Sequence, residues 1–130
     1  MSAADAGIEK IHATIIPVSD PDAMLAFYTE KLGLEVRVDV PFGGDYRWIE
    51  VGPEGAETNI ALAPPPPGKE DEAGGRETGI SLRTPDIDGL HAKLKAAGVD
   101  VDEEISRMGD PVPPMFWLRD PEGNTLLVVQ

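Results

Sequence analysis

The sequence predicts an α+β fold made of two βαβββ modules, whose curved mixed sheets surround a cleft. Three observations lead to this prediction. A pattern of strand, helix and three strands occurs twice, and the glycines that end the two predicted helices, Gly33 and Gly98, lie 65 residues apart. A Pro-Glu-Gly turn at 53–55 returns at 121–123. Paired modules explain such an internal repeat most economically.

The repeat divides the chain into four segments. We expect a flexible N-terminus over residues 1–7, a first module over 8–63, a linker over 64–77 and a second module over 78–130. The linker begins with four prolines and continues as a charged, glycine-containing tract without large apolar side chains outside those prolines. This composition is typical of a spacer and not of a packed element.

The first module opens with an apolar, β-branched run over 10–18, which predicts a strand covered on both faces. A helix should follow, because Asp20 is a favourable N-cap, Pro21 suits the first helical turn and Gly33 is a favourable stop. Its apolar residues recur at helical spacing: Met24, Phe27, Tyr28 and Leu32. Three alternating strands, separated by turn signals, should complete the module over residues 34–40, 46–51 and 58–63.

The second module repeats this order, beginning with a strand over 78–82. Its helix should start after the N-cap Asp86 and stop at Gly98, with one apolar face formed by Ile87, Leu90, Leu94 and Ala97. Three strands should follow over residues 99–105, 114–118 and 125–129. The turn before the last strand is Asp120-Pro121-Glu122-Gly123-Asn124, in which proline presets φ and glycine supplies a positive φ.

Composition and charge argue against several classes of function. A net charge of −13, from 24 acidic and 11 basic residues, argues against nucleic-acid binding and favours neutral or cationic small molecules. No run approaches the roughly 18 apolar residues that span a bilayer. The chain has no cysteine, and its first seven residues lack the features of a secretory signal. We therefore expect a cytoplasmic protein that binds neither nucleic acid nor membranes.

Six short motifs follow one another at characteristic spacing: Val18-Ser19-Asp20, Ala26-Phe27-Tyr28, Lys31-Leu32-Gly33-Leu34, Asp86-Ile87-Asp88, Lys95-Ala96-Ala97-Gly98-Val99 and Asp120-Pro121-Glu122-Gly123-Asn124. Through them, residues 11–130 resemble the vicinal oxygen chelate superfamily, also called the glyoxalase, bleomycin-resistance and extradiol-dioxygenase superfamily. The resemblance implies a glyoxalase-like fold of paired βαβββ modules, frequent assembly as dimers, and a divalent metal held in the cleft by the first and last strands of each module.

The four positions at which this family binds its metal carry no ligand here. Counted back from Gly33 and Gly98, which end the two predicted helices, the family's first-strand positions fall at Ala13 and Gly79. Its last-strand positions fall at Ala61 and Leu127. Divalent metals usually need three or more oxygen, nitrogen or sulfur donors from the protein. We therefore predict no metal, no other cofactor and no catalytic residue. His12 precedes Ala13, and strand alternation predicts that it points away from the cleft or flanks it at the start of the strand.

Strand alternation also predicts which side chains line the cleft. On the third strand these are Trp48 and Glu50, and a shift of 68 residues places Phe116 on the opposite wall, with Met115 and Trp117 as the alternative if that strand contains a bulge. The predicted ligand-binding residues are Ala13, Ile15, Trp48, Glu50, Asn59, Ala61, Gly79, Ser81, Phe116 and Leu127. Core packing explains Trp48 as well as ligand stacking does.

The pattern and the resemblance together favour a small-molecule binding protein similar to the bleomycin-resistance branch. Its ligand would be apolar or aromatic, and neutral or cationic. The alternatives are a metal-dependent lyase, isomerase or dioxygenase with non-standard ligands, and metal-independent acid-base catalysis through Glu50. We also expect a homodimer, because each module exposes a sheet edge and an apolar face that it cannot cover alone.

Overall fold

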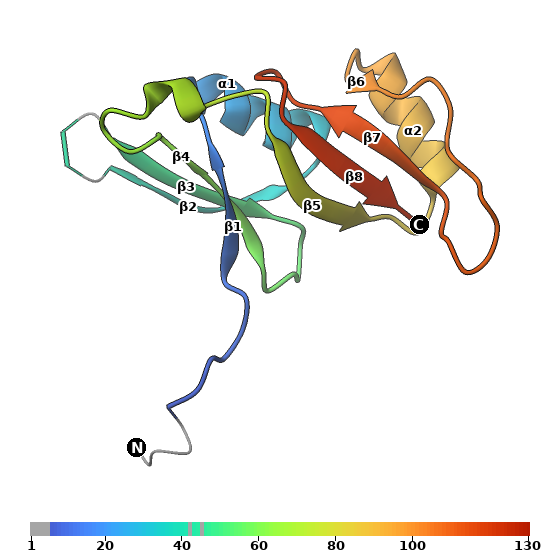
Figure 1. Cartoon of the computed structure of the whole chain (residues 1–130), viewed down its shortest axis with the longest axis horizontal. Coiled ribbons are helices and arrows are strands. Elements are labelled where there is room, and N and C mark those ends of the chain that lie inside the picture. Colours follow the sequence, from blue (N-terminus) through green and yellow to red (C-terminus); the bar gives the residue numbers. More distant parts are fainter. Residues whose placement is uncertain (1–5, 42, 45) are drawn as a thin grey trace.

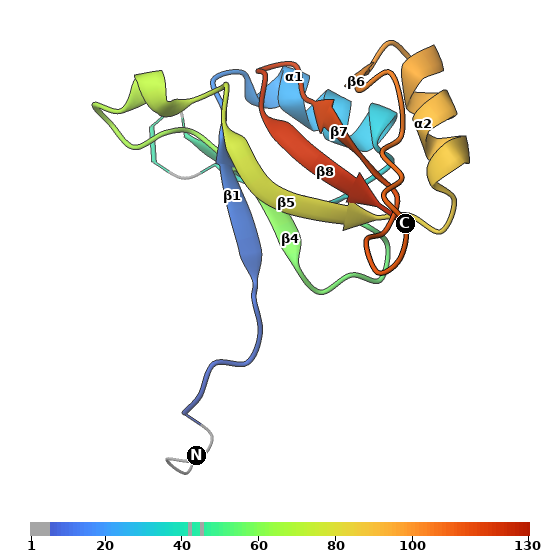
Figure 2. The same cartoon turned by 45° about the vertical axis from the view of Figure 1, so that its right-hand side comes forward.

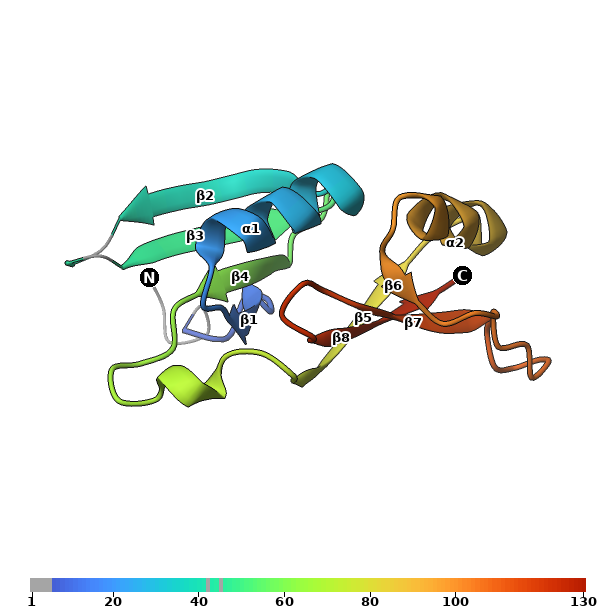
Figure 3. The same cartoon turned by 90° about the horizontal axis from the view of Figure 1, so that it is seen from above.

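A computed structural model of the chain describes residues 6–41, 43–44 and 46–130. The chain forms two four-stranded mixed sheets with helices packed on one side of them, which confirms the predicted α+β class and its two βαβββ-like modules (Figure 1). Seen from above, the first sheet with its helix α1 and the second sheet with α2 lie side by side (Figure 3). The flexible N-terminus predicted for residues 1–7 falls mostly outside the described residues.

The first sheet has the strand order β1-β4-β3-β2. Its strands are β1 (Ala13–Pro17), β2 (Glu35–Pro41), β3 (Arg47–Gly52) and β4 (Asn59–Ala63). β1 runs parallel to β4, and β3 runs antiparallel to both β4 and β2. The register sets Ile15 opposite Ala61 and Ala61 opposite Glu50, so these three side chains form a row across one face of the sheet.

The helix of the first module begins as predicted and then widens. α1 (Pro21–Ala26) is capped by Asp20, whose carboxylate accepts a hydrogen bond of 3.1 Å from the main-chain nitrogen of Ala23. It continues as the π-helix η2 (Phe27–Lys31), after which Gly33 takes a φ of 74°. The sequence predicted one continuous helix. The widened turn buries the adjacent aromatic rings of Phe27 and Tyr28, which meet edge to face at 5.2 Å.

The second sheet has the order β5-β8-β7-β6. The elements of the second module are β5 (Glu77–Arg83), α2 (Ile87–Ala96), β6 (Asp100–Val101), β7 (Met115–Arg119) and β8 (Thr125–Val129). The short 3-10 helix η3 (Glu70–Glu72) precedes them, in the segment predicted to be a linker. β6 is much shorter than the predicted strand over 99–105. The reason is Asp102, whose carboxylate accepts from the main-chain nitrogen of Trp117 at 3.0 Å, in the place of a ladder carbonyl.

A continuous apolar core lies between the helices and both sheets. It contains Ile16, Val18, Met24, Phe27, Tyr28, Ile49, Val51, Ile60, Leu62, Ile87, Leu94, Val99, Phe116, Leu118, Leu126 and Val128. The two modules therefore share one hydrophobic core on their helical side. Among the described residues, no helix packs on the opposite faces of the sheets (Figures 1 and 2).

The turn over residues 120–124 fastens the second module to α1. The carboxylate of Asp120 accepts a hydrogen bond of 2.8 Å from the hydroxyl of Tyr28 and one of 2.9 Å from Nδ2 of Asn124, and all three side chains are buried. Burial, and then the adjacent Asp120 carboxylate, raise the pKa of the Tyr28 hydroxyl, so this hydroxyl remains a donor. Glu122 reaches the start of α1, where it accepts from the main-chain nitrogens of Ser19 at 2.9 Å and Asp20 at 3.0 Å.

Glu122 provides a test of this connection, because Glu54 occupies the same place in the other Pro-Glu-Gly turn and no hydrogen bond ties it to the described residues. We expect Glu122→Ala to lower the free energy of unfolding by about 0.5–2 kcal/mol, as the loss of a helix-capping acceptor does. Glu54→Ala should change it by less than about 0.5 kcal/mol. Urea unfolding of both variants checks this, and equal effects of the two substitutions would contradict the assigned role of Glu122.

Candidate functional site

The face of the first sheet that points away from α1, here called the first open face, is apolar, with exposed side chains on β1 and β2 and buried ones at Glu50, Ala61 and Ala63. Alternation assigns to it Ala13, Ile15 and Pro17 of β1, Val38 and Val40 of β2, Trp48 and Glu50 of β3, and Asn59, Ala61 and Ala63 of β4. Ile15 is 60% exposed and Val40 48%, whereas Ile16 on the helical side is 1% exposed. Large apolar side chains on a face without cover indicate a place where a ligand or a second protein packs.

Glu50 is the polar centre of the first open face, and its side chain is only 6% exposed. Its carboxylate accepts hydrogen bonds from Trp48 Nε1 at 2.8 Å and from Asn59 Nδ2 at 2.8 Å. Nε2 of His12 lies 3.2 Å from Oε1 and 3.3 Å from Oε2. The hydrogen bond from Trp48 has the largest effect, and together with those from Asn59 and His12 it holds the pKa of Glu50 below its usual value despite burial. The carboxylate is therefore ionised at neutral pH.

Local backbone geometry brings these donors together. Trp48 and Glu50 are two residues apart on β3 and so share a face, while Asn59 starts the adjacent strand. Gly52 leaves room for the Asn59 amide, because a Cβ at Gly52 would lie 2.9 Å from Asn59 Oδ1. His12 lies just before β1 and does not follow strand alternation, so of the two alternatives the flanking position is the one observed.

The corresponding face of the second sheet, the second open face, carries Trp117 instead of Phe116. Leu127 lies opposite both Ser81 of β5 and Trp117 of β7, so these three side chains form a row, and Trp117 is 43% exposed. Phe116 is 1% exposed and packs under α2, with its ring edge-on to His91 at 4.9 Å. The prediction that Phe116 lines the cleft was therefore wrong in orientation. Trp117, the alternative, faces the second open face, although β7 pairs with β8 without the bulge on which that alternative depended. Its contact with a ligand stays a prediction.

A one-residue difference between the modules explains this error. Pro53 follows Glu50 by three residues, whereas Pro121 follows Trp117 by four. The shift of 68 residues between the two turns therefore does not apply to the strands before them, where Trp117 corresponds to Glu50 at a shift of 67. A slip of one residue moves each side chain to the other face of a strand.

The structure divides the predicted ligand-binding residues between two sheets. Ala13, Ile15, Trp48, Glu50, Asn59 and Ala61 belong to the first open face, and Gly79, Ser81 and Leu127 belong to the second sheet, where Gly79 takes a φ of 72° at an irregularity of β5. A cavity of about 450 Å³ between the modules brings three of them together: Asn59, Gly79 and Ser81.

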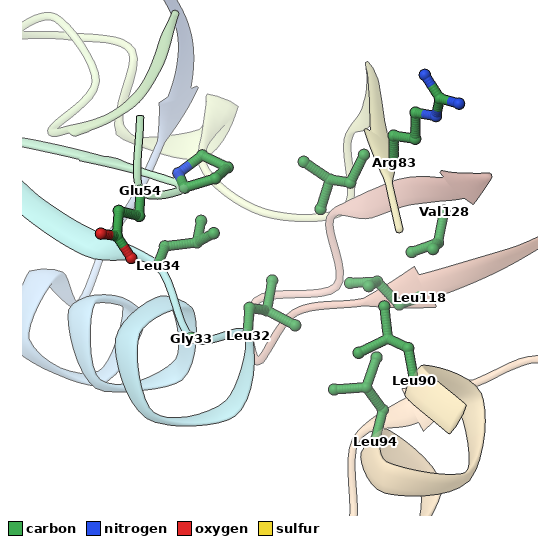
Figure 4. Close-up of a pocket in the computed structure, with 11 residues that line it drawn as sticks. Leu32, Gly33, Leu34, Glu54, Arg83, Leu90, Leu94, Leu118 and Val128 are labelled. Carbon is green, nitrogen blue, oxygen red and sulfur yellow. The ribbon is translucent and has the colours of Figure 1, made fainter. Parts of the chain in front are cut away.

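A second cavity of about 220 Å³ lies on the helical side, and the sequence analysis did not predict it. Leu32 and Leu34 face Leu90, Leu94 and Leu118 across it, and the Arg83 guanidinium points away from these leucines (Figure 4). This cavity depends on how the two modules pack against each other. Helical periodicity identifies each leucine as a core residue but gives no sign of the gap between them.

The residues present do not fit the family's divalent metal. Ala13, Ala61, Gly79 and Leu127 have no side-chain donor, and nowhere in the described part of the chain do three or more His, Cys, Asp or Glu residues group in a way that could hold a metal ion. His12 with Glu50 supplies two donors, fewer than the usual number. In the same part of the chain, no helix has both the length and the apolar character needed to cross a membrane.

The lowered pKa of Glu50 predicts how stability depends on pH. A group whose folded pKa is depressed stabilises the protein above its unfolded pKa, about 4.3 for Glu, and this contribution is lost as the pH falls through the folded pKa. We expect Glu50→Gln to lower the free energy of unfolding by about 1–3 kcal/mol at pH 7. The difference from the wild type should shrink below about pH 4.3. Urea unfolding between pH 7 and 3 measures it, and a difference independent of pH would contradict the network.

The donor set also predicts the response to metals. We expect the purified protein to contain no stoichiometric divalent ion, and its melting temperature to be unchanged by EDTA or by added nickel, zinc or iron, because a ligand that does not bind the folded state cannot stabilise it. Elemental analysis and thermal melts test this. About one tightly held metal ion per chain would overturn it, and His12 with Glu50 would then be the first pair to replace.

Comparisons with known proteins agree with this architecture. The family model of the Glyoxalase/Bleomycin resistance protein/Dioxygenase superfamily matches residues 10–128. The protein YurT of Bacillus subtilis (strain 168) is 36% identical over 128 residues, covering 93% of this chain and 98% of YurT.

Two solved structures are similar over nearly the whole chain. A superfamily member from Sphaerobacter thermophilus DSM 20745 is 34% identical, with a TM-score of 0.84 over 94% of this chain and 97% of its own. TnmS3, an antibiotic binding protein from Streptomyces sp. CB03234, is 32% identical, with a TM-score of 0.80 over 95% of this chain and 96% of its own. The repeated modules, the motifs and these similarities show that the chain belongs to the glyoxalase, bleomycin-resistance protein and dioxygenase superfamily.

Proposed function

We propose that this protein binds a small apolar or aromatic ligand, neutral or cationic, on the first open face, without chemical conversion. One combination of features carries the proposal. Ile15 and Val40 are exposed apolar side chains, and on the same face the buried Glu50 accepts hydrogen bonds from its neighbours. An apolar surface with a few fixed polar groups is characteristic of small-molecule sites.

The charge of the site and of the chain favours a neutral or cationic ligand. Glu50 is ionised, and the chain carries a net charge of −13, so an anion approaching this face meets an unfavourable potential. Affinity would come mainly from apolar burial and from stacking on Trp48, whose indole nitrogen is bonded to Glu50. This fixed ring supports the stacking role of Trp48 over simple core packing.

The similarity to TnmS3 supports the class of function, because TnmS3 is an antibiotic binding protein with the same fold over nearly the whole chain. The enzyme alternatives receive less support. A metal-dependent lyase, isomerase or dioxygenase lacks its donor set here. Glu50 is also a poor candidate general base, because the hydrogen bonds that lower its pKa weaken it as a proton acceptor.

We further propose a two-fold homodimer, located in the cytoplasm, in which the open faces of two copies cover each other. Ile15 and Val40 on the first open face and Trp117 on the second are between 43% and 60% exposed in the single chain. Such faces are costly to leave in water, and an isologous interface between copies covers both at once. The first open face of one protomer and the second open face of its partner would then enclose the ligand.

Replacing Trp48 tests the site. We expect Trp48→Ala to weaken the binding of the cationic aromatic probe 9-aminoacridine by about 1–3 kcal/mol, as the loss of an aromatic anchor does. Trp48→Phe keeps an aromatic face and should weaken binding less. Isothermal titration calorimetry measures both, with circular dichroism as the control for folding. If Trp48→Ala folds and binds like the wild type, the first open face is not the site.

Light scattering tests the assembly. We expect a dimer at micromolar concentration, and we expect Ile15→Glu to shift the equilibrium toward the monomer because it places a charge within an apolar interface. Arg47, which is bonded to Asp39 on the same sheet, offers a conservative control as Arg47→Lys. A wild-type protein that remains a monomer at micromolar concentration would contradict the dimer.

A further inference from the structure

The carboxylate of Glu50 has little capacity left for a ligand. It is buried, and the donors of Trp48, Asn59 and His12 surround its two oxygens at 2.8–3.3 Å. An ionised carboxylate offers about four lone-pair sites, and these three donors already occupy most of them. A ligand on the first open face therefore needs another polar atom to bind to.

His12 provides that atom. Its side chain is 65% exposed, and its Nε2 points at Glu50. Because an ionised carboxylate can only accept hydrogen bonds, Nε2 must carry a proton. In the neutral ring Nδ1 is then an acceptor, and among the described residues no group donates a hydrogen bond to it.

Glu50 also fixes where this acceptor lies relative to the aromatic surface. Trp48 Nε1 and His12 Nε2 lie 2.8 Å and 3.3 Å from the same carboxylate oxygen, Oε2 of Glu50. Both rings therefore border one small area of the first open face. A ligand that packs on the indole would hold its polar substituent close to the imidazole.

We propose that His12 determines ligand specificity, with Nδ1 accepting a hydrogen bond from a hydroxyl group on an aromatic ligand that packs against Trp48. Glu50 is the positioning residue that orients both rings. The inference rests on the proposed function and adds to it the chemical class of the ligand, a hydroxylated aromatic compound. It assigns the polar contact to His12 and not, as the sequence suggested, to Glu50.

A matched pair of probes tests the contact. 2-Naphthol donates a hydroxyl hydrogen, and 2-methoxynaphthalene has the same rings without that donor. We expect the wild type to bind 2-naphthol roughly three- to tenfold more tightly in NMR titrations at pH 8, the usual worth of one hydrogen bond. His12→Ala should abolish this preference, so that the two probes bind with about equal affinity. Lys10→Ala, an exposed change on the same segment, should retain it.

The outcomes separate this inference from the proposed function. If both probes bind the first open face equally and His12→Ala changes neither affinity, the role of His12 is wrong while the small-molecule site stands. If neither probe binds that face, both proposals are overturned. A preference that survives His12→Ala but disappears in Glu50→Gln would assign the contact to Glu50 and also overturn the role of His12.

The role of Glu50 has its own spectroscopic signature. Long-range ¹H–¹⁵N correlation spectra distinguish the protonated from the unprotonated nitrogen of a histidine ring, and the chain has only two histidines to assign. We expect His12 to carry its proton on Nε2 in the wild type and to become a mixture of tautomers in Glu50→Ala. An unchanged tautomer in Glu50→Ala would contradict the positioning role.

Discussion

The buried carboxylate of Asp120 is the interaction on which the arrangement of the two modules depends. A buried polar group is costly unless its hydrogen bonds are satisfied, and Asp120 accepts from the Tyr28 hydroxyl, the Asn124 amide and the main-chain nitrogens of Glu122 and Asn124. The observed conformation of the turn provides all of these donors. That conformation places Glu122 at the start of α1 and directs the chain into β8, so the last turn of the second module is fixed to the first helix of the first.

This connection lies on the helical side and leaves the other faces of the sheets open. The shared core absorbs the apolar side chains of every second strand position, and the alternate positions, among them Ile15 and Trp117, face outward. The first open face differs from ordinary exposed surface in one respect, which is the network around Glu50. Three donors from three separate segments converge on this carboxylate, so the polar groups of the face are already in position before a ligand arrives.

Local signals in the sequence were sufficient for most of the fold. Asp20 and Asp86 cap their helices as predicted, and the strand predicted over 125–129 has the observed bounds, because caps and alternation act within a few residues. The departures from the prediction have two origins, a local irregularity in the repeat and a contact between distant parts of the chain. Trp117 replaces Phe116 on the second open face because one additional residue precedes the turn. The contact between His12 and Glu50 joins residues 38 positions apart, and neither residue carries a signal of the other.

We propose that the ligand lies on the first open face and not in the apolar cavity on the helical side. Intermolecular nuclear Overhauser effects between bound 2-naphthol and the protein test this location most directly. We expect contacts from the naphthol ring to the indole of Trp48 and the methyl groups of Ile15. Contacts confined to the methyl groups of Leu32, Leu90 and Leu94, which line the helical-side cavity, would contradict it.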